Sequence, residues 1–316
     1  MKVKKRVKII IPVAVLLVLL LLLFLKCWYE SKDYEFKLYY NHAEITKYKG
    51  TDKNVVIPDR IFGKKVTVIK SAFKRNDGIE SVELPKYLEE IGGNAFKECK
   101  NLETVWFGEN TKVVKASAFE ECIKLKNVYL NEGITVIGGS AFEATEQLET
   151  IVIPSSVERI GCWAFENSGL KGVTFQGEKV CIEERAFRNT PWQEKQEGFL
   201  ICGDNVLVCY NGTEEVVQVP HGVKYISASF EKAEEFKEVY LPDTVIEIID
   251  VSCLWRRRGR VYIPSSVEKI SGDLYSMFDL SSVTIVTTAG SYAEEFAKEN
   301  GFNLEIVDEI VYPGEN

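Results

Sequence analysis

The residues of this chain that could perform acid–base or nucleophilic chemistry are few and scattered. Histidine occurs only at His42 and His221, and neither belongs to a Ser-His-Asp arrangement or an HExxH motif. No phosphate-binding loop and no GxGxxG motif occurs. Pairs of adjacent acids fall where the chain is expected to turn toward solvent, at Glu89-Glu90, Glu120-Glu121 and Glu183-Glu184. We therefore expect no catalytic residue and no cofactor, and the chain is not predicted to be an enzyme.

Eight cysteines raise the questions of metal binding and of disulfide bonds. No CxxC motif occurs and no histidine accompanies a cysteine, so no metal site is expected. Cys99 and Cys122 are 23 residues apart, and the next two steps of 23 reach Thr145 and Ser168. Small, semi-polar residues at this spacing favour buried free thiols in a repeat interior. Disulfide bonds remain the alternative.

A cluster of arginines stands out in an otherwise acidic region, in the stretch LWRRRGR at residues 254–260. An unpaired guanidinium is costly to bury, so Arg256, Arg257 and Arg258 are expected to reach solvent. Arg260 is expected on the same surface as Tyr262. The cluster is interpreted either as a binding patch or as a locally repacked segment.

The charge distribution separates the first 26 residues from the rest. The net charge is −8, yet those 26 residues hold six basic side chains and no acid, so the remainder is more acidic still. An acidic surface argues against a nucleic-acid partner. After the basic residues 1–8, seventeen uncharged, apolar residues run from Ile9 to Leu25, which is about 25 Å of helix.

This pattern predicts a single transmembrane anchor at Ile9–Leu25, a basic cytoplasmic tail at 1–8 and an extracytoplasmic remainder. A cleaved signal peptide needs small residues after the apolar run, and Leu25-Lys26-Cys27-Trp28 offers none. Lys26 before Cys27 also argues against a lipoprotein signal.

The residues discussed above are positioned by a sequence repeat. The dipeptide Ala-Phe recurs at 72–73, 95–96, 118–119, 141–142, 164–165 and 186–187. A strand-like tetrapeptide, written VxLP after its commonest form, recurs in the same phase. Its nine copies are VELP (82–85), VWFG (105–108), VYLN (128–131), IVIP (151–154), VTFQ (173–176), VQVP (217–220), VYLP (239–242), VYIP (261–264) and VTIV (283–286).

Units of 22 or 23 residues are too short to bury their own apolar side, so they must stack. We predict a repeat solenoid of about nine coils with one parallel β-sheet. Bulky phenylalanines opposite the strands predict that the solenoid is curved, with its strands on the concave face. Residues 190–213 contain FLIC and VLVCY around a turn, which predicts an inserted β-hairpin. Residues 291–300 predict a short capping helix between Ser291 and Gly301.

The unit, best seen in IPSSVERIGCWAF (153–165) and AFKECKNLETV (95–105), resembles the BspA-like, treponemal-type leucine-rich repeat over residues 44–307. The resemblance implies a surface or secreted protein with an adhesive or binding role and no shared chemistry. The expected organisation is a juxtamembrane or amino-terminal cap at 26–43, a leucine-rich repeat solenoid at 44–290 and a carboxyl-terminal cap at 291–316.

Strand alternation points the second residue of each VxLP copy outward. Two aromatic pairs result, Trp106 with Tyr129 and Tyr240 with Tyr262, and Arg260 lies just before Tyr262. These five residues are the candidate ligand site, because exposed rings can stack on a sugar or a peptide side chain. The competing interpretation is that tyrosine and tryptophan simply suit exposed strand positions.

The sequence therefore predicts a membrane-anchored, cell-surface leucine-rich-repeat protein that binds a protein or a glycan through its concave face. The alternative is a structural scaffold of the cell envelope without a dedicated ligand.

Overall fold

A computed structural model describes residues 3–177, 179–183, 185–202, 205–229, 236–249, 259–271 and 282–314. In the first helix it describes the side chains of residues 15–26, 28, 29 and 31. The predictions for Arg256–Arg258 and for the hairpin turn at residues 203–204 lie outside these residues.

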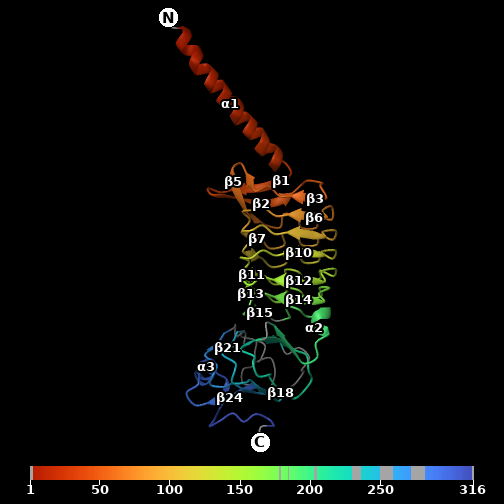
Figure 1. Ribbon diagram of the computed structural model, residues 1–316, viewed down its shortest axis with the longest axis vertical. Coiled ribbons are helices and arrows are strands. Elements are labelled where there is room, and N and C mark those ends of the chain that lie inside the picture. The colour runs from red at the N-terminus through yellow and green to blue at the C-terminus, as the bar shows by residue number, and fades with distance from the viewer. Residues whose placement is uncertain are drawn as a thin grey trace.

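The chain forms a β-solenoid in which two stacks of short strands run side by side along the molecule (Figure 1). The VxLP copies build the first stack, whose strands pair in parallel. Its strands are β3 (Asn54–Val56), β6 (Ser81–Glu83), β8 (Thr104–Trp106), β10 (Asn127–Tyr129), β12 (Thr150–Ile153), β14 (Gly172–Phe175), β18 (Val216–Gln218), β20 (Glu238–Tyr240), β22 (Gly259–Tyr262), β24 (Val283–Thr288) and β25 (Asn303–Val307). The described chain therefore makes about eleven turns, two more than predicted. We call the solvent side of this stack the strand face.

The second stack was not predicted, because most of its strands are only two residues long. Most of them arise where one apolar residue after the VxLP turn, such as Ile91, is buried and pairs with its equivalents in neighbouring coils. Its strands are β2 (His42–Tyr48), β5 (Lys64–Ile69), β7 (Glu90–Ile91), β9 (Val113–Val114), β11 (Val136–Ile137), β13 (Arg159–Ile160), β15 (Cys181–Ile182), β17 (Val206–Tyr210), β19 (Tyr225–Ser229), β21 (Glu247–Ile248) and β23 (Lys269–Ile270). The predicted parallel pairing of the VxLP strands is present, divided over three sheets, and this second stack lies beside it.

The interior of each coil is filled as the repeat predicts. The apolar positions of the unit at residues 82–104 are at most 4% exposed: Val82, Leu84, Leu88, Ile91, Ala95, Phe96, Cys99 and Leu102. The Ala-Phe dipeptides form a continuous column of stacked rings, with neighbouring centroids 4.8–5.2 Å apart from Phe73 to Phe187. Tyr48 stacks on the first ring at 4.9 Å and Trp192 meets the last edge-on at 5.0 Å. Aromatic rings thus close both ends of the column.

The turn that carries each Ala-Phe dipeptide has an unusual backbone. The residue before the alanine and the second residue after the phenylalanine both adopt φ between 51° and 61°, although none of them is glycine. They are Ser71, Arg75, Asn94, Glu98, Ser117, Glu121, Ser140, Ala144, Trp163, Asn167, Arg185 and Asn189. This conformation aligns the backbone N–H of each phenylalanine with the next coil, as in Phe96 donating to the carbonyl of Ala118 at 2.7 Å. The repeated hydrogen bond offsets a steric cost at each left-handed position.

The array is divided into two blocks near residue 200. In the described residues no strand ladder continues from β15 to β17, and two hydrophobic clusters fill the two blocks. The predicted hairpin is present as β16 (Phe199–Cys202) and β17, paired antiparallel. It is not an external insertion, because β17 is buried throughout and pairs in parallel with β19. The hairpin therefore supplies one coil of the second block and begins its second stack.

Side chains on both sides of this junction tie the blocks together. The Ser227 hydroxyl donates to the Ile182 carbonyl at 3.0 Å and accepts from the Ile182 N–H at 2.7 Å. Lys179 forms an ion pair with Glu247 at 2.6 Å. Helix α2 (Pro191–Glu194), capped by the Thr190 side chain, leads from the first block into the hairpin.

Both ends of the solenoid are covered. At the amino-terminal end β1 (Tyr34–Leu38) pairs antiparallel with β2, and β4 (Arg60–Ile61) pairs antiparallel with β5. The predicted capping helix is confirmed as α3 (Tyr292–Asn300), with the Ser291 hydroxyl accepting from the Glu294 N–H at 3.1 Å and Gly301 at φ 78°. The chain then adds one more strand, β25, inside the region expected to be only a cap.

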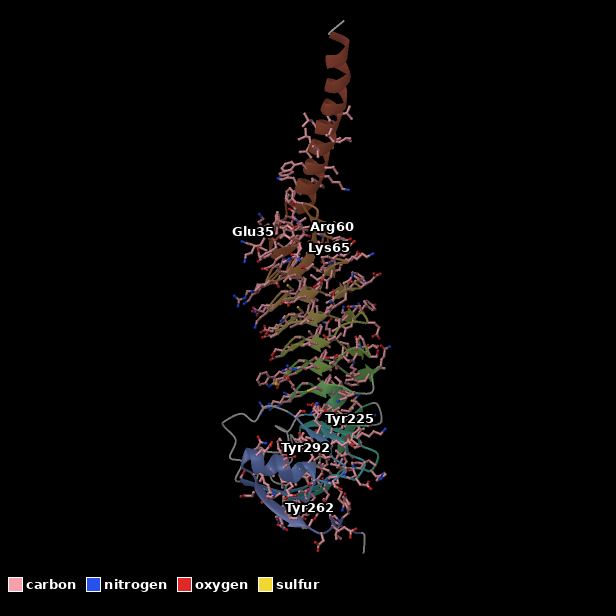
Figure 2. The ribbon with its side chains drawn as sticks, turned by 90° about the vertical axis from the view of Figure 1, so that its left-hand side faces the viewer. Glu35, Arg60, Lys65, Tyr225, Tyr262 and Tyr292 are labelled. Carbon is pink, nitrogen blue, oxygen red and sulfur yellow. The ribbon has the colours of Figure 1, made fainter. Side chains whose placement is uncertain are left out.

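Helix α1 (Val3–Ser31) leads away from the solenoid (Figure 1), and Figure 2 places Arg60 and Lys65 near its base. Among the residues that the structure describes, no helix combines the length and apolarity needed to cross a membrane. The span predicted at Ile9–Leu25 is therefore not confirmed. The predicted curvature is not evident either, since the coils from β5 to β15 stack along a nearly straight line in Figure 1.

Candidate functional site

The strand face has the alternation that the sequence predicts. In β6 and β8 the first VxLP residue is buried and the second is exposed. Tyr129 lies directly opposite Trp106 in the parallel ladder of β8 and β10. Trp106 is 45% exposed and Tyr129 57% exposed. The repeat therefore presents two aromatic side chains from neighbouring coils on one surface.

The surface beside Tyr129 is irregular. No ladder joins β10 to β12 in this described part of the chain, although β11 and β13 stay paired in the second stack. Val128 and Leu130 are consequently only partly buried, and Val152 on β12 is exposed. The apolar character of the strand face therefore extends from Trp106 across the interruption to Val152.

A groove of ≈ 470 Å³ lies on the other side of Trp106, where β3, β6 and β8 end in their turns. Apolar groups line part of it, among them Val56, Pro58 and the Trp106 side chain. Charged groups of both signs also line it, the acids Asp59, Glu83 and Glu109 and the base Lys86. An aromatic wall beside mixed charge is suited to a ligand with both an apolar surface and polar groups.

The second predicted pair has a different environment. The rings of Tyr240 and Tyr262 stack with centroids 4.0 Å apart and planes 8° apart. Both hydroxyls donate to the Glu238 carboxylate, at 2.9 Å from Tyr240 and 3.1 Å from Tyr262. Tyr240 is only 7% exposed, so it does not offer a free ring. Burial, reinforced by Tyr262 and Glu238, raises the pKa of Tyr240 above its ordinary value.

The expectation that Tyr240 is exposed is therefore wrong, because a later part of the chain covers it. The Tyr312 ring lies 6.1 Å from the Tyr240 ring, and the Tyr312 hydroxyl donates to the Leu241 carbonyl at 3.0 Å. Figure 2 shows Tyr262 in the half of the molecule far from α1.

Arg260 precedes this tyrosine pair and is engaged by an acid. Its register partner in β20 is Glu238, and its guanidinium forms an ion pair with Glu305 of β25. Because both side chains of the ion pair are over 40% exposed, it is open to solvent and contributes little to stability. Among the predicted site residues, Trp106 and Tyr129 thus form one open surface, while Tyr240 and Tyr262 form a separate, covered one.

The other side chains that could take part in catalysis or metal binding make structural contacts instead. The acid pairs predicted to face solvent supply ion pairs between coils, with Lys97 bound to Glu120 at 2.6 Å and Arg159 bound to Glu183. His221 lies 3.2 Å from Asp243 at an exposed turn. The described residues contain no group of three or more side chains that could hold a metal ion.

The thiols Cys99 and Cys122 are fully buried and donate to the carbonyls of Phe73 and Phe96, at 2.9 and 3.1 Å. Their predicted place inside the coils is confirmed. Cys99, Cys122 and Cys202 are free thiols.

Two features of the site were missed from the sequence. The tetrapeptide VVIP at residues 55–58 is an earlier copy of the VxLP unit, and its outward residue is the apolar Val56. This residue is a signal that could have extended the site toward the groove. Nothing in the repeat pattern marks Tyr312, which follows the last strand and reaches back over β20.

Two solved bacterial leucine-rich repeat proteins are similar to this chain. A leucine rich cell surface protein of Faecalibacterium prausnitzii is 21% identical, with a TM-score of 0.50 over 89% of this chain and 97% of that one. A leucine rich repeat protein of T. pallidum is 19% identical, with a TM-score of 0.43 over 88% of this chain and 98% of that one. At 21% identity the likeness to the first of these concerns the fold alone. A search of curated proteins found no match.

The family assignment rests on the repeat itself. A family model described as the BspA type leucine rich repeat region matches residues 66–192 and 208–305 in six copies. These ranges hold the stacked phenylalanines and most of the VxLP strands. The chain belongs to the BspA-type leucine-rich repeat family.

Proposed function

We propose that this chain is a non-enzymatic, extracytoplasmic binding or adhesion protein that recognises a protein or a glycan through its strand face, the face that the sequence expects to be concave. The observation that carries the proposal is the pair Trp106 and Tyr129, which lie opposite each other on neighbouring strands and are about half exposed. Bulky aromatic groups that a rigid scaffold keeps in solvent are suited to recognition.

The residues around Trp106 and Tyr129 are suited to ligand binding rather than to catalysis. The groove beside Trp106 offers an aromatic wall together with Glu83 and Lys86. An aromatic ring can cover the apolar face of a sugar or of a peptide side chain. The Glu83 carboxylate can then accept hydrogen bonds from hydroxyl or amide groups, and the Lys86 ammonium can donate to their oxygens. The ladders hold the two aromatic residues in a fixed register, so little conformational entropy is lost on binding.

The test is capture by the full chain on arrays of immobilised oligosaccharides and of proteins from cell envelopes and host tissue. The double variant Trp106→Ala/Tyr129→Ala is expected to lose capture without unfolding. Tyr292→Ala is the matched control, because Tyr292 is also exposed but lies on α3 (Figure 2). Full capture by the double variant would rule out the strand face around Trp106.

Membrane attachment through α1 is a separate part of the proposal. It is supported by eleven consecutive apolar residues, Val15 to Leu25, whose side chains are 48–60% exposed. So much apolar surface is unfavourable in water and is satisfied by lipid. We expect the full chain to stay with membranes after an alkaline wash and the variant Leu19→Arg/Leu22→Arg to be released. Release of both chains would contradict attachment through α1.

The same apolar helix is also the observation that favours the alternative function, an envelope scaffold without a dedicated ligand. The two functions differ in which variants matter. A scaffold loses partner association when α1 is altered by Leu19→Arg/Leu22→Arg, and it is indifferent to Trp106→Ala/Tyr129→Ala. A binding protein released from the membrane still captures its ligand in solution.

A further inference from the structure

The seven residues after β25, residues 308–314, run back across the strand face of the second block. We call them the cover segment. The Tyr312 hydroxyl donates to the carbonyl of Leu241, the residue after β20, at 3.0 Å. The Gln218 side-chain amide, on β18, donates to the carbonyl of Pro313 at 2.7 Å. The segment therefore reaches from the last strand of the stack to a strand four positions earlier in the ladder.

The cover segment lies where one aromatic residue of the strand face has a much smaller exposed fraction than its equivalent in the first block. Tyr240 holds the same position in its VxLP copy as Trp106, yet Tyr240 is 7% exposed and Trp106 is 45% exposed. The Tyr312 ring, 6.1 Å from the Tyr240 ring, lies on the side that the repeat leaves open elsewhere. The cover segment is thus seated on a surface that would otherwise present the stacked pair Tyr240 and Tyr262.

The contacts made by this surface are those of a peptide-binding site. The Gln218 side chain donates to a backbone carbonyl of the segment, and the Leu241 carbonyl accepts from a tyrosine hydroxyl. The Tyr240 ring lies near the aromatic ring of the segment. The floor is rigid, because Glu238 holds both tyrosine hydroxyls. Proline after the aromatic residue keeps the bound segment extended and removes a backbone donor that would need a partner.

The cover segment is not part of the strand stack. It forms no strand in residues 308–314, and Val311, Pro313 and Gly314 are exposed. Its tether to β25 gives it a high effective concentration at this surface. A free segment of the same chemistry competes with it only when the tethered copy is weakened.

We propose that the strand face over β18 and β20 is a docking site for an extended peptide with an aromatic–proline pair on a partner protein, and that the cover segment is its resident occupant. The proposal concerns the second block and does not depend on Trp106 or Tyr129. Recognition uses one side chain and one main-chain contact on each side, as in other modes of extended-peptide binding.

The experiment measures binding of a fluorescein-labelled peptide with the sequence IVYPGE, residues 310–315, to full chains by fluorescence anisotropy. The variant Tyr312→Ala opens the site, and we expect it to bind the peptide at least about tenfold more tightly than the unaltered chain. A peptide with alanine in place of the tyrosine is expected not to bind. Adding Gln218→Ala to the opened chain is expected to weaken binding again.

Two further arms keep the result decisive. Pro313→Gly is a second opened chain, and since Pro313 is exposed, this change leaves the fold intact. Adding Trp106→Ala/Tyr129→Ala to the Tyr312→Ala chain is expected to leave peptide binding unchanged, which separates this site from the proposed function. Equal binding to opened and unaltered chains, or no binding to either opened chain, would overturn the proposal.

Discussion

Tyr262 lies directly opposite Tyr240 in the ladder of β20 and β22, with ring centroids 4.0 Å apart. Tyr129 has the same relation to Trp106 in the ladder of β8 and β10. The repeat therefore builds the same arrangement twice, but only the Trp106 pair is open to solvent. What distinguishes the two is a covering segment from outside the repeat, so exposure cannot be read from repeat position alone.

The stacked phenylalanines are expected to hold the first block together. Phe119 is fully buried and stacks on Phe96 at 5.1 Å and on Phe142 at 5.2 Å. Phe119→Ala removes both contacts and leaves a cavity, so the free energy of unfolding should fall by about 3–5 kcal/mol. Urea unfolding followed by circular dichroism measures it. Tyr129→Ala, on the outside of the next coil, should cost far less, and equal losses would show that the ring column carries no special weight.

The left-handed turn positions predict an unusual response to glycine. Ala144 has φ 55°, which costs an alanine about 1–2 kcal/mol, whereas glycine adopts it freely. After the entropy that glycine loses on folding, Ala144→Gly should leave the chain as stable or up to about 1 kcal/mol more stable. Gln147→Gly, three residues on and outside the left-handed region, should destabilise by about 0.5–1 kcal/mol. Urea unfolding measures both variants. A lower urea midpoint for Ala144→Gly as well as for Gln147→Gly would contradict this account.

Acid should weaken the junction between the two blocks. Burial alone would raise the pKa of Glu247, but hydrogen bonds and ion pairs with Lys179 and Lys269 more than offset it and hold the pKa below its ordinary value. A carboxylate with a lowered pKa stabilises the fold above its unfolded pKa, about 4.3. That stability is lost as the pH falls through the folded value.

The matched variant for this effect is Glu247→Gln, which keeps the shape and removes the charge. Its unfolding midpoint should be lower than that of the unaltered chain at pH 7, and the two should converge as the pH drops below about 4. Thermal melting between pH 3 and pH 7 measures the difference. A constant gap at every pH would mean that the charge of Glu247 is not responsible.

The thiols inside the coils should be unreactive in the folded chain. Burial raises the pKa of Cys202 to about 12, so the thiol stays protonated at pH 8. Alkylation by iodoacetamide, followed peptide by peptide in a mass spectrometer, should be at least about tenfold slower for Cys202 in the native chain than in urea. Rapid native alkylation of Cys202 would show that the hairpin opens on the timescale of labelling.

The sequence was sufficient where a pattern repeats over many residues. The Ala-Phe spacing predicted the phenylalanine column, VxLP alternation predicted which strand residues face inward, and Ser291 and Gly301 marked the ends of α3. Each of these signals follows from a local rule that the coil obeys whatever its neighbours do.

The sequence was insufficient where the outcome depends on distant contacts. A two-residue strand such as Glu90–Ile91 is too short to show alternation, so the second stack left no readable pattern. The fate of Tyr240 is decided by Tyr312, 72 residues away and outside the repeat. The hairpin could be predicted from the sequence. Its burial as a coil could not, because that depends on pairing between β17 and β19.

The most direct test of the central claim is a double-mutant cycle on Trp106 and Tyr129, measured as the affinity for a ligand captured by the unaltered chain. If the two residues form one recognition surface, each alanine variant should weaken binding by about fivefold or more, roughly 1 kcal/mol. The double variant should differ from the sum of the single changes by about 0.5 kcal/mol or more, because residues that share a ligand are coupled. An affinity unchanged in the double variant would contradict recognition through this face.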